Sequence, residues 1–97
     1  MQNVNRAKIY WISFENGGRK SPPKGSQYST VARFEDIKDK WPNEAWSIVV
    51  DFIKHDGSCS EGNIRFLVEW APNNLLYSGS KFDLFEGSKI VAKCEVV

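Results

Sequence analysis

The sequence predicts an all-β fold, a small antiparallel barrel or sandwich of about six strands. Several short segments alternate apolar and polar residues with a period of two, which is the pattern of half-buried strands. The segments between them are rich in Gly, Pro, Ser and Asn, and only one short stretch has helical spacing. Closure into a barrel is favoured for so small a sheet, because it removes exposed edge strands.

Length and composition fit one packed domain spanning residues 1–97. Hydrophobic residues make up 41% of the chain and aromatic residues 13%, which excludes disorder as a description of the whole chain. The formal net charge is only +1, so no field of the whole molecule attracts nucleic acid or anionic lipid. Binding to either would depend on a local patch.

The chain begins with a strand, a loop and a second strand. Residues 7–14 are mostly apolar on both faces, as in a strand that is covered on both sides or carries an exposed aromatic ring. Residues 16–26 hold three glycines and two prolines, so we expect a loop there. Residues 27–34 predict the second strand.

A short helical turn and the third strand follow. Ile37 and Trp41 are four residues apart and a proline comes next, so a helical turn over 35–42, packed on the side of the barrel, is expected. Residues 46–52 alternate clearly and predict a strand. Its apolar members are Trp46, Ile48, Val50 and Phe52.

Three strands complete the set. A polar loop is predicted over 55–62, followed by a strand over 64–70 with the apolar members Ile64, Phe66, Val68 and Trp70. Strands over 81–86 and 90–96 are joined by a hairpin turn at Glu86-Gly87-Ser88. The apolar members of the last strand are Ile90, Ala92, Cys94 and Val96.

Three segments, in order, carry a likeness to one known family. Residues 13–22 with Gly25 are similar to its S-x-E-E-G-G-R-H-T-P segment, residues 62–72 to its G-D-N-I/V-x-x-x-V-x-L-I-x-P strand, and residues 82–92 to its R-F-A-I-R-E-G-G-R-T-V-G-A hairpin. The chain thus resembles, over residues 7–97, the C-terminal β-barrel domain of the elongation factor Tu class of translation GTPases, as a stand-alone domain. The resemblance implies a closed six-stranded antiparallel barrel, which agrees with the number of strands predicted above.

Nucleotide binding is not expected. The segment Gly17-Gly18-Arg19-Lys20-Ser21 looks superficially like a phosphate loop, but it lacks the G-x-x-x-x-G-K-[ST] spacing and no helix is predicted after it. The N-K-x-D motif that reads guanine in these GTPases is also missing from the sequence. We therefore predict no cofactor, no GTPase activity and no bound nucleotide.

A basic loop is the candidate for contact with nucleic acid. Residues 1–40 carry a charge balance of +4 and residues 41–97 a balance of −3. The candidate residues are Arg19, Lys20, Lys24, Tyr28 and Lys89. In the resembled family, the G-G-R-H loop and the hairpin turn contact the T stem of aminoacyl-tRNA through phosphate and sugar. Here Lys20 and Lys89 replace a His and an Arg, and the family's P-Q-F strand motif is missing. Three or four phosphate contacts, without the two further domains of the full factor, imply only weak RNA or tRNA binding.

Exposed aromatic side chains are the candidates for contact with a protein. A core of this size does not obviously have room for four further large rings, and exposed aromatic residues are enriched at interfaces. The four candidates are Trp11, Trp41, Trp70 and Tyr77. The resembled domain docks on its own GTPase domain and on exchange factors, so protein binding is also implied by the likeness. We predict a non-catalytic, translation-related binding module, with an unidentified protein partner ahead of RNA.

A small hydrolase-type enzyme is the remote alternative. His55, Asp56 and Cys59 would have to supply its chemistry, and adding Glu61 gives a set of possible metal ligands. Residues so close in sequence rarely form such sites, and a solvated loop His beside a turn-forming Asp-Gly explains them. We therefore predict no catalytic residue and no metal site.

The cysteines and the ends of the sequence favour the cytoplasm. Cys59 and Cys94 lack the C-x-x-C spacing of zinc and redox sites, and we expect two reduced thiols. No apolar signal-peptide region occurs at the N-terminus, and no apolar run approaches the length of a membrane span. Membrane attachment is not expected.

Overall fold

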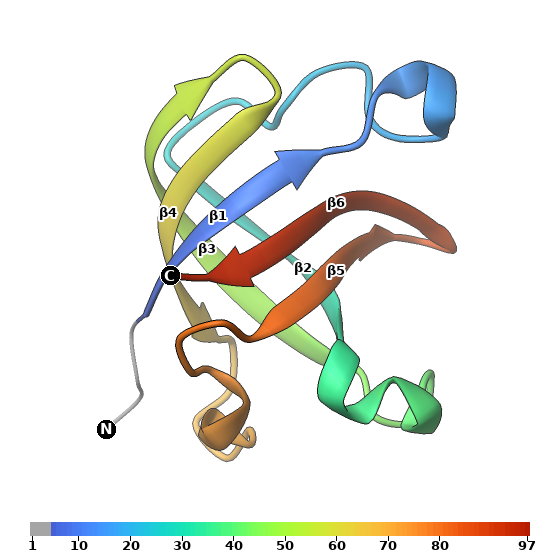
Figure 1. Ribbon diagram of the computed structural model, residues 1–97, viewed down its shortest axis with the longest axis vertical. Coiled ribbons are helices and arrows are strands. Elements are labelled where there is room, and N and C mark those ends of the chain that lie inside the picture. The colour runs from blue at the N-terminus through green and yellow to red at the C-terminus, as the bar shows by residue number, and fades with distance from the viewer. Residues whose placement is uncertain (1–4) are drawn as a thin grey trace.

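Six antiparallel strands close into a barrel in the computed structural model, which describes residues 5–97 (Figure 1). The strands are β1 (Asn5–Trp11), β2 (Gln27–Phe34), β3 (Trp46–Asp56), β4 (Cys59–Phe66), β5 (Lys81–Glu86) and β6 (Lys89–Val96). Their order around the barrel is β1-β4-β3-β2-β5-β6, and β6 pairs with β1 to close the ring. The predicted all-β, closed six-stranded barrel is therefore confirmed.

The period-two alternation fills the inside of the barrel. Ile48, Val50 and Ile64 are fully buried. Phe34 on β2 packs with its ring centroid 5.5 Å from that of Phe66 on β4, so side chains of strands that are not paired with each other meet in the core. Interdigitated side chains of this kind supply most of the stability of a small domain.

The bounds predicted for the polar loop and the fourth strand, residues 55–62 and 64–70, are wrong. Instead of a loop over 55–62, β3 and β4 continue as a hairpin through a turn at residues 57–58, and β4 already ends at Phe66. A β-bulge between Phe52 and Lys54 breaks the two-residue period, so the polar outer part of the hairpin does not look like a strand in the sequence. Gly62 permits the close pairing there, since a Cβ atom on it would lie 2.7 Å from the carbonyl oxygen of Asp51.

The first and third strands also differ from their predicted bounds, and the third, predicted over 46–52, extends to Asp56. The first strand begins and ends earlier than the predicted 7–14, because the chain turns into the short 3-10 helix η1 (Phe14–Asn16). The expected helical turn after β2 is the 3-10 helix η2 (Glu35–Lys40), and η3 (Asn73–Leu75) lies between β4 and β5. Within residues 5–97, no helix combines the length and the apolar character needed to cross a membrane.

Antiparallel strand order places the connections at two opposite ends of the barrel (Figure 1). One end is formed by residues 12–26 and the tight turns at 57–58 and 87–88; these hold three cations and one carboxylate, a balance of +2. The other end is formed by residues 35–45 and 67–80, which hold two cations and five carboxylates, a balance of −3. We call the first the basic end and the second, which carries Trp41, Trp70 and Tyr77, the aromatic end.

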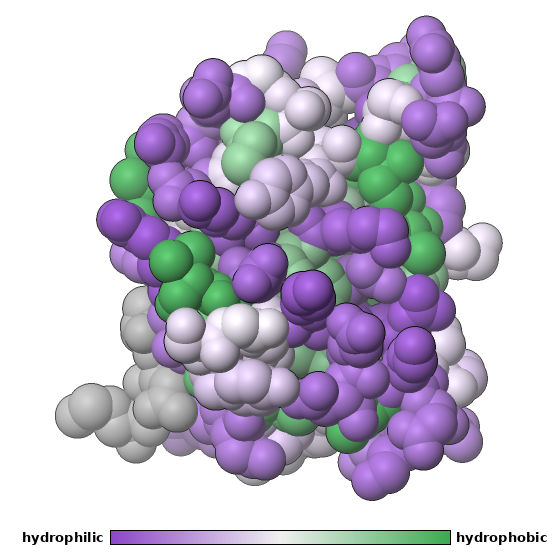
Figure 2. Space-filling view, in the orientation of Figure 1, coloured by the Kyte–Doolittle hydropathy of each residue, from purple (hydrophilic) through white to green (hydrophobic). Residues whose placement is uncertain are grey.

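A ladder of alternating charge runs around the outside of the barrel wall. Neighbouring strands pair Lys81 with Glu95, Glu95 with Lys8, Lys8 with Glu61, and Glu61 with Lys54. Lys54 Nζ lies 3.2 Å from a carboxylate oxygen of Glu61. Figure 2 shows a largely hydrophilic face on which apolar areas are separated by polar ones. This face of the wall is mostly polar (Figure 2), which favours the two ends as surfaces for a macromolecular partner.

The ladder leads to a prediction about stability. Lys8→Glu would place three carboxylates in a row, and like charges opposite one another on a sheet are expected to cost about 1 kcal/mol. Urea unfolding at low salt measures this loss. Lys24→Glu makes the same change of charge in a loop outside the sheet and should change the free energy of unfolding by less than about 0.5 kcal/mol. Equal losses for both variants would contradict the role of the ladder.

Candidate functional site

The β4–β5 connection displays the most exposed aromatic ring of the chain on a firmly anchored loop. Trp70 is 78% exposed and Leu67 is 52% exposed. Ala71, Leu75 and Leu76, from the same connection, are buried and belong to the core cluster. The connection is therefore held by its own apolar anchors, and Trp70 is not one of them. An exposed Trp on a fixed support is a favourable anchor for an interface, because little conformational freedom is lost when it is covered.

Tyr77 links this connection to η2. It is 46% exposed, and its hydroxyl donates a hydrogen bond of 2.5 Å to Oδ2 of Asp36. That bond to a carboxylate raises the pKa of the Tyr77 phenol above its usual value. The two loops that form the aromatic end are thereby joined through side chains.

The other two predicted partner-binding residues have structural roles. Trp11 is only 9% exposed, and its Nε1 donates a hydrogen bond of 2.8 Å to Oγ of Ser60 inside the barrel. Trp41 is half-buried, and its ring stacks on Phe85 with centroids 4.6 Å apart. Of the four aromatic residues predicted to form a partner surface, Trp70 and Tyr77 are the ones with a large exposed area.

At the basic end, Glu86 holds two of the candidate RNA-binding residues. Its carboxylate accepts hydrogen bonds from the Arg19 guanidinium and from the Tyr28 hydroxyl. The 12–26 loop and the β5–β6 hairpin are thus brought together. Gly18 allows this path, since a Cβ atom on it would lie 1.8 Å from the carbonyl oxygen of Ile12.

Tyr28 is half-buried in a cluster with the rings of Trp11 and Phe52, and the Arg19 guanidinium lies 5.7 Å from its ring centroid. Its ring centroid lies 5.8 Å from that of Trp11 and 6.5 Å from that of Phe52, and its pKa is raised by burial and by the neighbouring Glu86 carboxylate. A ring held in this way is not available to stack on a base. Its hydroxyl stays protonated and serves as a donor to Glu86.

The pKa of Glu86 reflects a balance of opposing effects. Partial burial alone would raise it, but the hydrogen bonds from Tyr28 and Arg19 and the positive charges of Arg19 and Lys89 outweigh burial and lower it. The carboxylate therefore stays ionised and offsets part of the local positive charge. Lys20, Lys24 and Lys89 are exposed and take no part in an ion pair among residues 5–97.

His55, the histidine of the catalytic alternative, contacts Ser60 and Phe52. His55 Nδ1 lies 2.6 Å from Oγ of Ser60, and the His55 ring contacts that of Phe52 at 4.5 Å between centroids. Ser60 is 1% exposed and also receives the hydrogen bond from Trp11, so its hydroxyl is a structural link. Asp56 and Cys59 are paired across the hairpin turn.

Both cysteines are free thiols in the structure. Cys59 is half-buried, and burial raises the pKa of the Cys94 thiol well above its usual value. No cluster of three or more potential metal ligands occurs among residues 5–97.

The Ser60 link leads to a second prediction. Ser60→Ala would leave the buried Trp11 N–H without its acceptor, which should lower the free energy of unfolding by about 1–3 kcal/mol in urea unfolding. A double variant that combines Ser60→Ala with Trp11→Phe, which removes the donor, measures the energetic coupling between the two side chains. We expect the double variant to lose less than the sum of the two single losses, and simple additivity would contradict the link.

Sequence reasoning missed Glu86 and Ser60 as organising residues and assigned Leu67 to a strand. Glu86 and Ser60 act through partners 67 and 49 residues away, so no local pattern signals them. Comparison with models of known protein families gives no match, and comparison with curated proteins gives none either.

Proposed function

We propose that this protein is a non-catalytic binding module of the cytoplasm, and that its aromatic end docks on a protein partner. The observation that carries the proposal is the 78% exposure of Trp70, with exposed Leu67 three residues before it, on a connection anchored by buried residues. The similarity to the C-terminal barrel of the elongation factor Tu class, a domain that docks on other proteins, is consistent with this role and forms part of the proposal.

The charge of the aromatic end indicates the chemistry of the partner. Its loops carry a balance of −3, so a partner segment that sets Arg or Lys beside apolar side chains would be complementary. An exposed Trp face attracts the guanidinium of Arg better than any other ring does. We therefore expect Trp70 to receive an apolar or Arg side chain of a basic segment.

Site-specific photo-crosslinking tests this proposal. A photoreactive amino acid is placed at exposed Asn74 in the β4–β5 connection, and in a second variant at Lys24 in the basic loop. We expect a discrete protein adduct from position 74 that survives moderate salt, with basic residues in the crosslinked segment. If position 74 gives no protein adduct, or position 24 alone gives one, the aromatic end is not the docking surface.

Weak RNA binding at the basic end is the second candidate. It is favoured by the contact that Glu86 makes with Arg19, which brings Lys20 and Lys24 to the same end as Lys89. If the three lysines each contact a phosphate of single-stranded RNA, a plot of the logarithm of the binding constant against the logarithm of the salt concentration should have a slope of about −2. Part of the positive charge is offset by Glu86 itself, which places this candidate second.

A tRNA titration at low salt provides the test of that alternative. Lys20→Gln combined with Lys24→Gln should weaken the binding of labelled tRNA about tenfold and lower the salt slope. An affinity that the two substitutions leave unchanged, or failure to bind at low salt, would remove the RNA candidate.

A further inference from the structure

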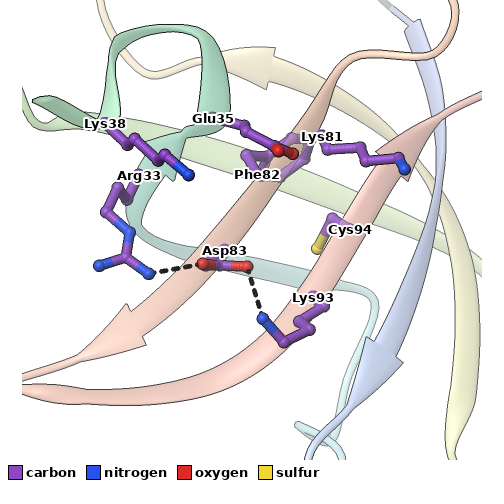
Figure 3. A pocket seen from close by; sticks show the side chains of 8 residues that line it. All are labelled: Arg33, Glu35, Lys38, Lys81, Phe82, Asp83, Lys93 and Cys94. Atoms are coloured by element: carbon purple, nitrogen blue, oxygen red, sulfur yellow. Dashed lines mark hydrogen bonds and ion pairs between the residues drawn. The ribbon is translucent and has the colours of Figure 1, made fainter.

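A cavity of about 300 Å³ lies where β2, β5, β6 and η2 meet on the side of the barrel (Figure 3). Its lining shares Glu35 and Lys38 with the aromatic end but includes neither Leu67, Trp70 nor Tyr77, and it does not involve the basic loop. Four of the residues that line it are cations and two are carboxylates. The cations are Arg33, Lys38, Lys81 and Lys93, and the carboxylates are Glu35 and Asp83. The resulting balance of +2 is concentrated in a small volume of an almost neutral protein.

One carboxylate is shared between two of the cations. Asp83 Oδ2 lies 2.8 Å from Nη2 of Arg33, and its Oδ1 lies 3.5 Å from Nζ of Lys93 (Figure 3). Lys38 and Lys81 form no ion pair with any carboxylate among residues 5–97. The positive charge of the cavity is therefore only partly neutralised by the protein itself.

Arg33 is held in place by more than its ion pair. Its guanidinium lies 5.0 Å from the ring centroid of Phe85 and 5.8 Å from that of Trp41. Trp41 and Phe85 are stacked on each other, so the two rings and Asp83 together fix the guanidinium. This gives the half-buried Trp41 a role as a support of the cavity. A fixed Arg beside exposed Lys side chains suits an anion that is bound from several directions.

We propose that this cavity binds the phosphate group of a small phosphorylated molecule. A phosphate monoester carries a charge close to −2 at neutral pH and three acceptor oxygens, which match the +2 balance and the several donors here. A volume of about 300 Å³ admits a phosphate with a small organic group, but not a large ligand. The proposal goes beyond partner docking and does not depend on it.

Nuclear magnetic resonance titration of the full chain tests the proposal. The probes are inorganic phosphate, O-phospho-L-serine and glucose 6-phosphate, each compared with sodium chloride at equal ionic strength. We expect saturable shifts of the amide signals of Arg33, Asp83 and Lys93, with a Kd of about 1 mM or lower. A lower Kd for one organic phosphate identifies the kind of molecule that carries the phosphate group. Equal Kd values for all three probes indicate that the phosphate alone is recognised.

A matched pair of variants locates the site. Lys38→Gln with Lys81→Gln removes two exposed charges at the cavity, whereas Lys24→Gln with Lys89→Gln removes two exposed charges at the basic end. The first variant should raise the Kd about tenfold or more, and the second less than about twofold. Equal weakening by both variants, shifts that centre on residues 12–26, or no saturation up to about 20 mM phosphate would overturn the proposal.

Discussion

Trp70→Ala is expected to lower the affinity for the protein partner about 30-fold or more, a loss of about 2 kcal/mol or more in binding free energy. Trp70 is 78% exposed and stands on a connection whose Ala71, Leu75 and Leu76 are buried. The substitution removes the largest side chain that a partner could cover, while the anchors of the loop stay in place. Isothermal titration calorimetry with the crosslinked partner, once identified, measures the loss.

Two comparisons separate binding from folding in this experiment. The midpoint of thermal unfolding of Trp70→Ala should stay close to that of the wild type, because a mostly exposed ring contributes little to the core. Tyr10→Ala removes another exposed aromatic residue, 49% exposed on the barrel wall, and should leave partner affinity unchanged. Equal losses for the Tyr10 and Trp70 variants would contradict a docking surface at the aromatic end.

Glu86→Ala is expected to have the largest effect on stability among substitutions of partly exposed residues. It would leave the Arg19 guanidinium and the Tyr28 hydroxyl without their shared acceptor. The expected cost is about 2–3 kcal/mol, out of a total of about 5–15 kcal/mol for a domain of this size. Urea unfolding at pH 7 measures it. Glu15→Ala removes an exposed carboxylate from the same end and should change stability by less than about 0.5 kcal/mol.

The same cluster predicts a dependence on pH. Because the pKa of Glu86 is lowered in the folded state, its contribution is present above the pKa of an unfolded Glu, about 4.3, and is lost as the pH falls through the folded value. The pKa of Tyr28 is raised, so its contribution is present below the unfolded pKa, about 10, and is lost as the pH rises through the folded value. Glu86→Gln, which keeps an acceptor but does not titrate, should flatten the acid side of the stability profile. If Glu86→Gln leaves the acid side of the stability profile unchanged, the titration of Glu86 does not contribute to the pH dependence of folding.

The barrel could be predicted from the sequence because its inside follows a simple rule. Side chains of a strand point alternately in and out, so Ile48, Val50 and Ile64 reveal the core without any knowledge of pairing. The rule failed at the β3–β4 hairpin. There a bulge shifts the register after Phe52, and the outer part of the hairpin is held by backbone hydrogen bonds between polar residues. Hydropathy carries no information about such a segment.

The candidate surfaces were predictable only in part. The charge difference between the two ends did not follow from the difference between the two parts of the sequence, because Glu35, Asp36 and Asp39 belong to the basic part but lie at the aromatic end. Which aromatic side chains face water depends on contacts between distant residues. Trp11 is buried through Ser60, and Tyr28 is held by Glu86, 49 and 58 residues away in the chain. Only the closed barrel brings these partners together.

The most direct test of the proposed function is a capture experiment with three forms of the protein. They are the wild type, an aromatic-end variant (Leu67→Ser with Trp70→Ser) and a basic-end variant (Lys20→Gln with Lys24→Gln and Lys89→Gln), compared at low and moderate salt. We predict one protein, with a basic binding segment, that the wild type and the basic-end variant retain at moderate salt and that the aromatic-end variant loses. Loss of the captured protein with the basic-end variant alone, or salt-sensitive capture of RNA with no protein that depends on Trp70, would contradict it.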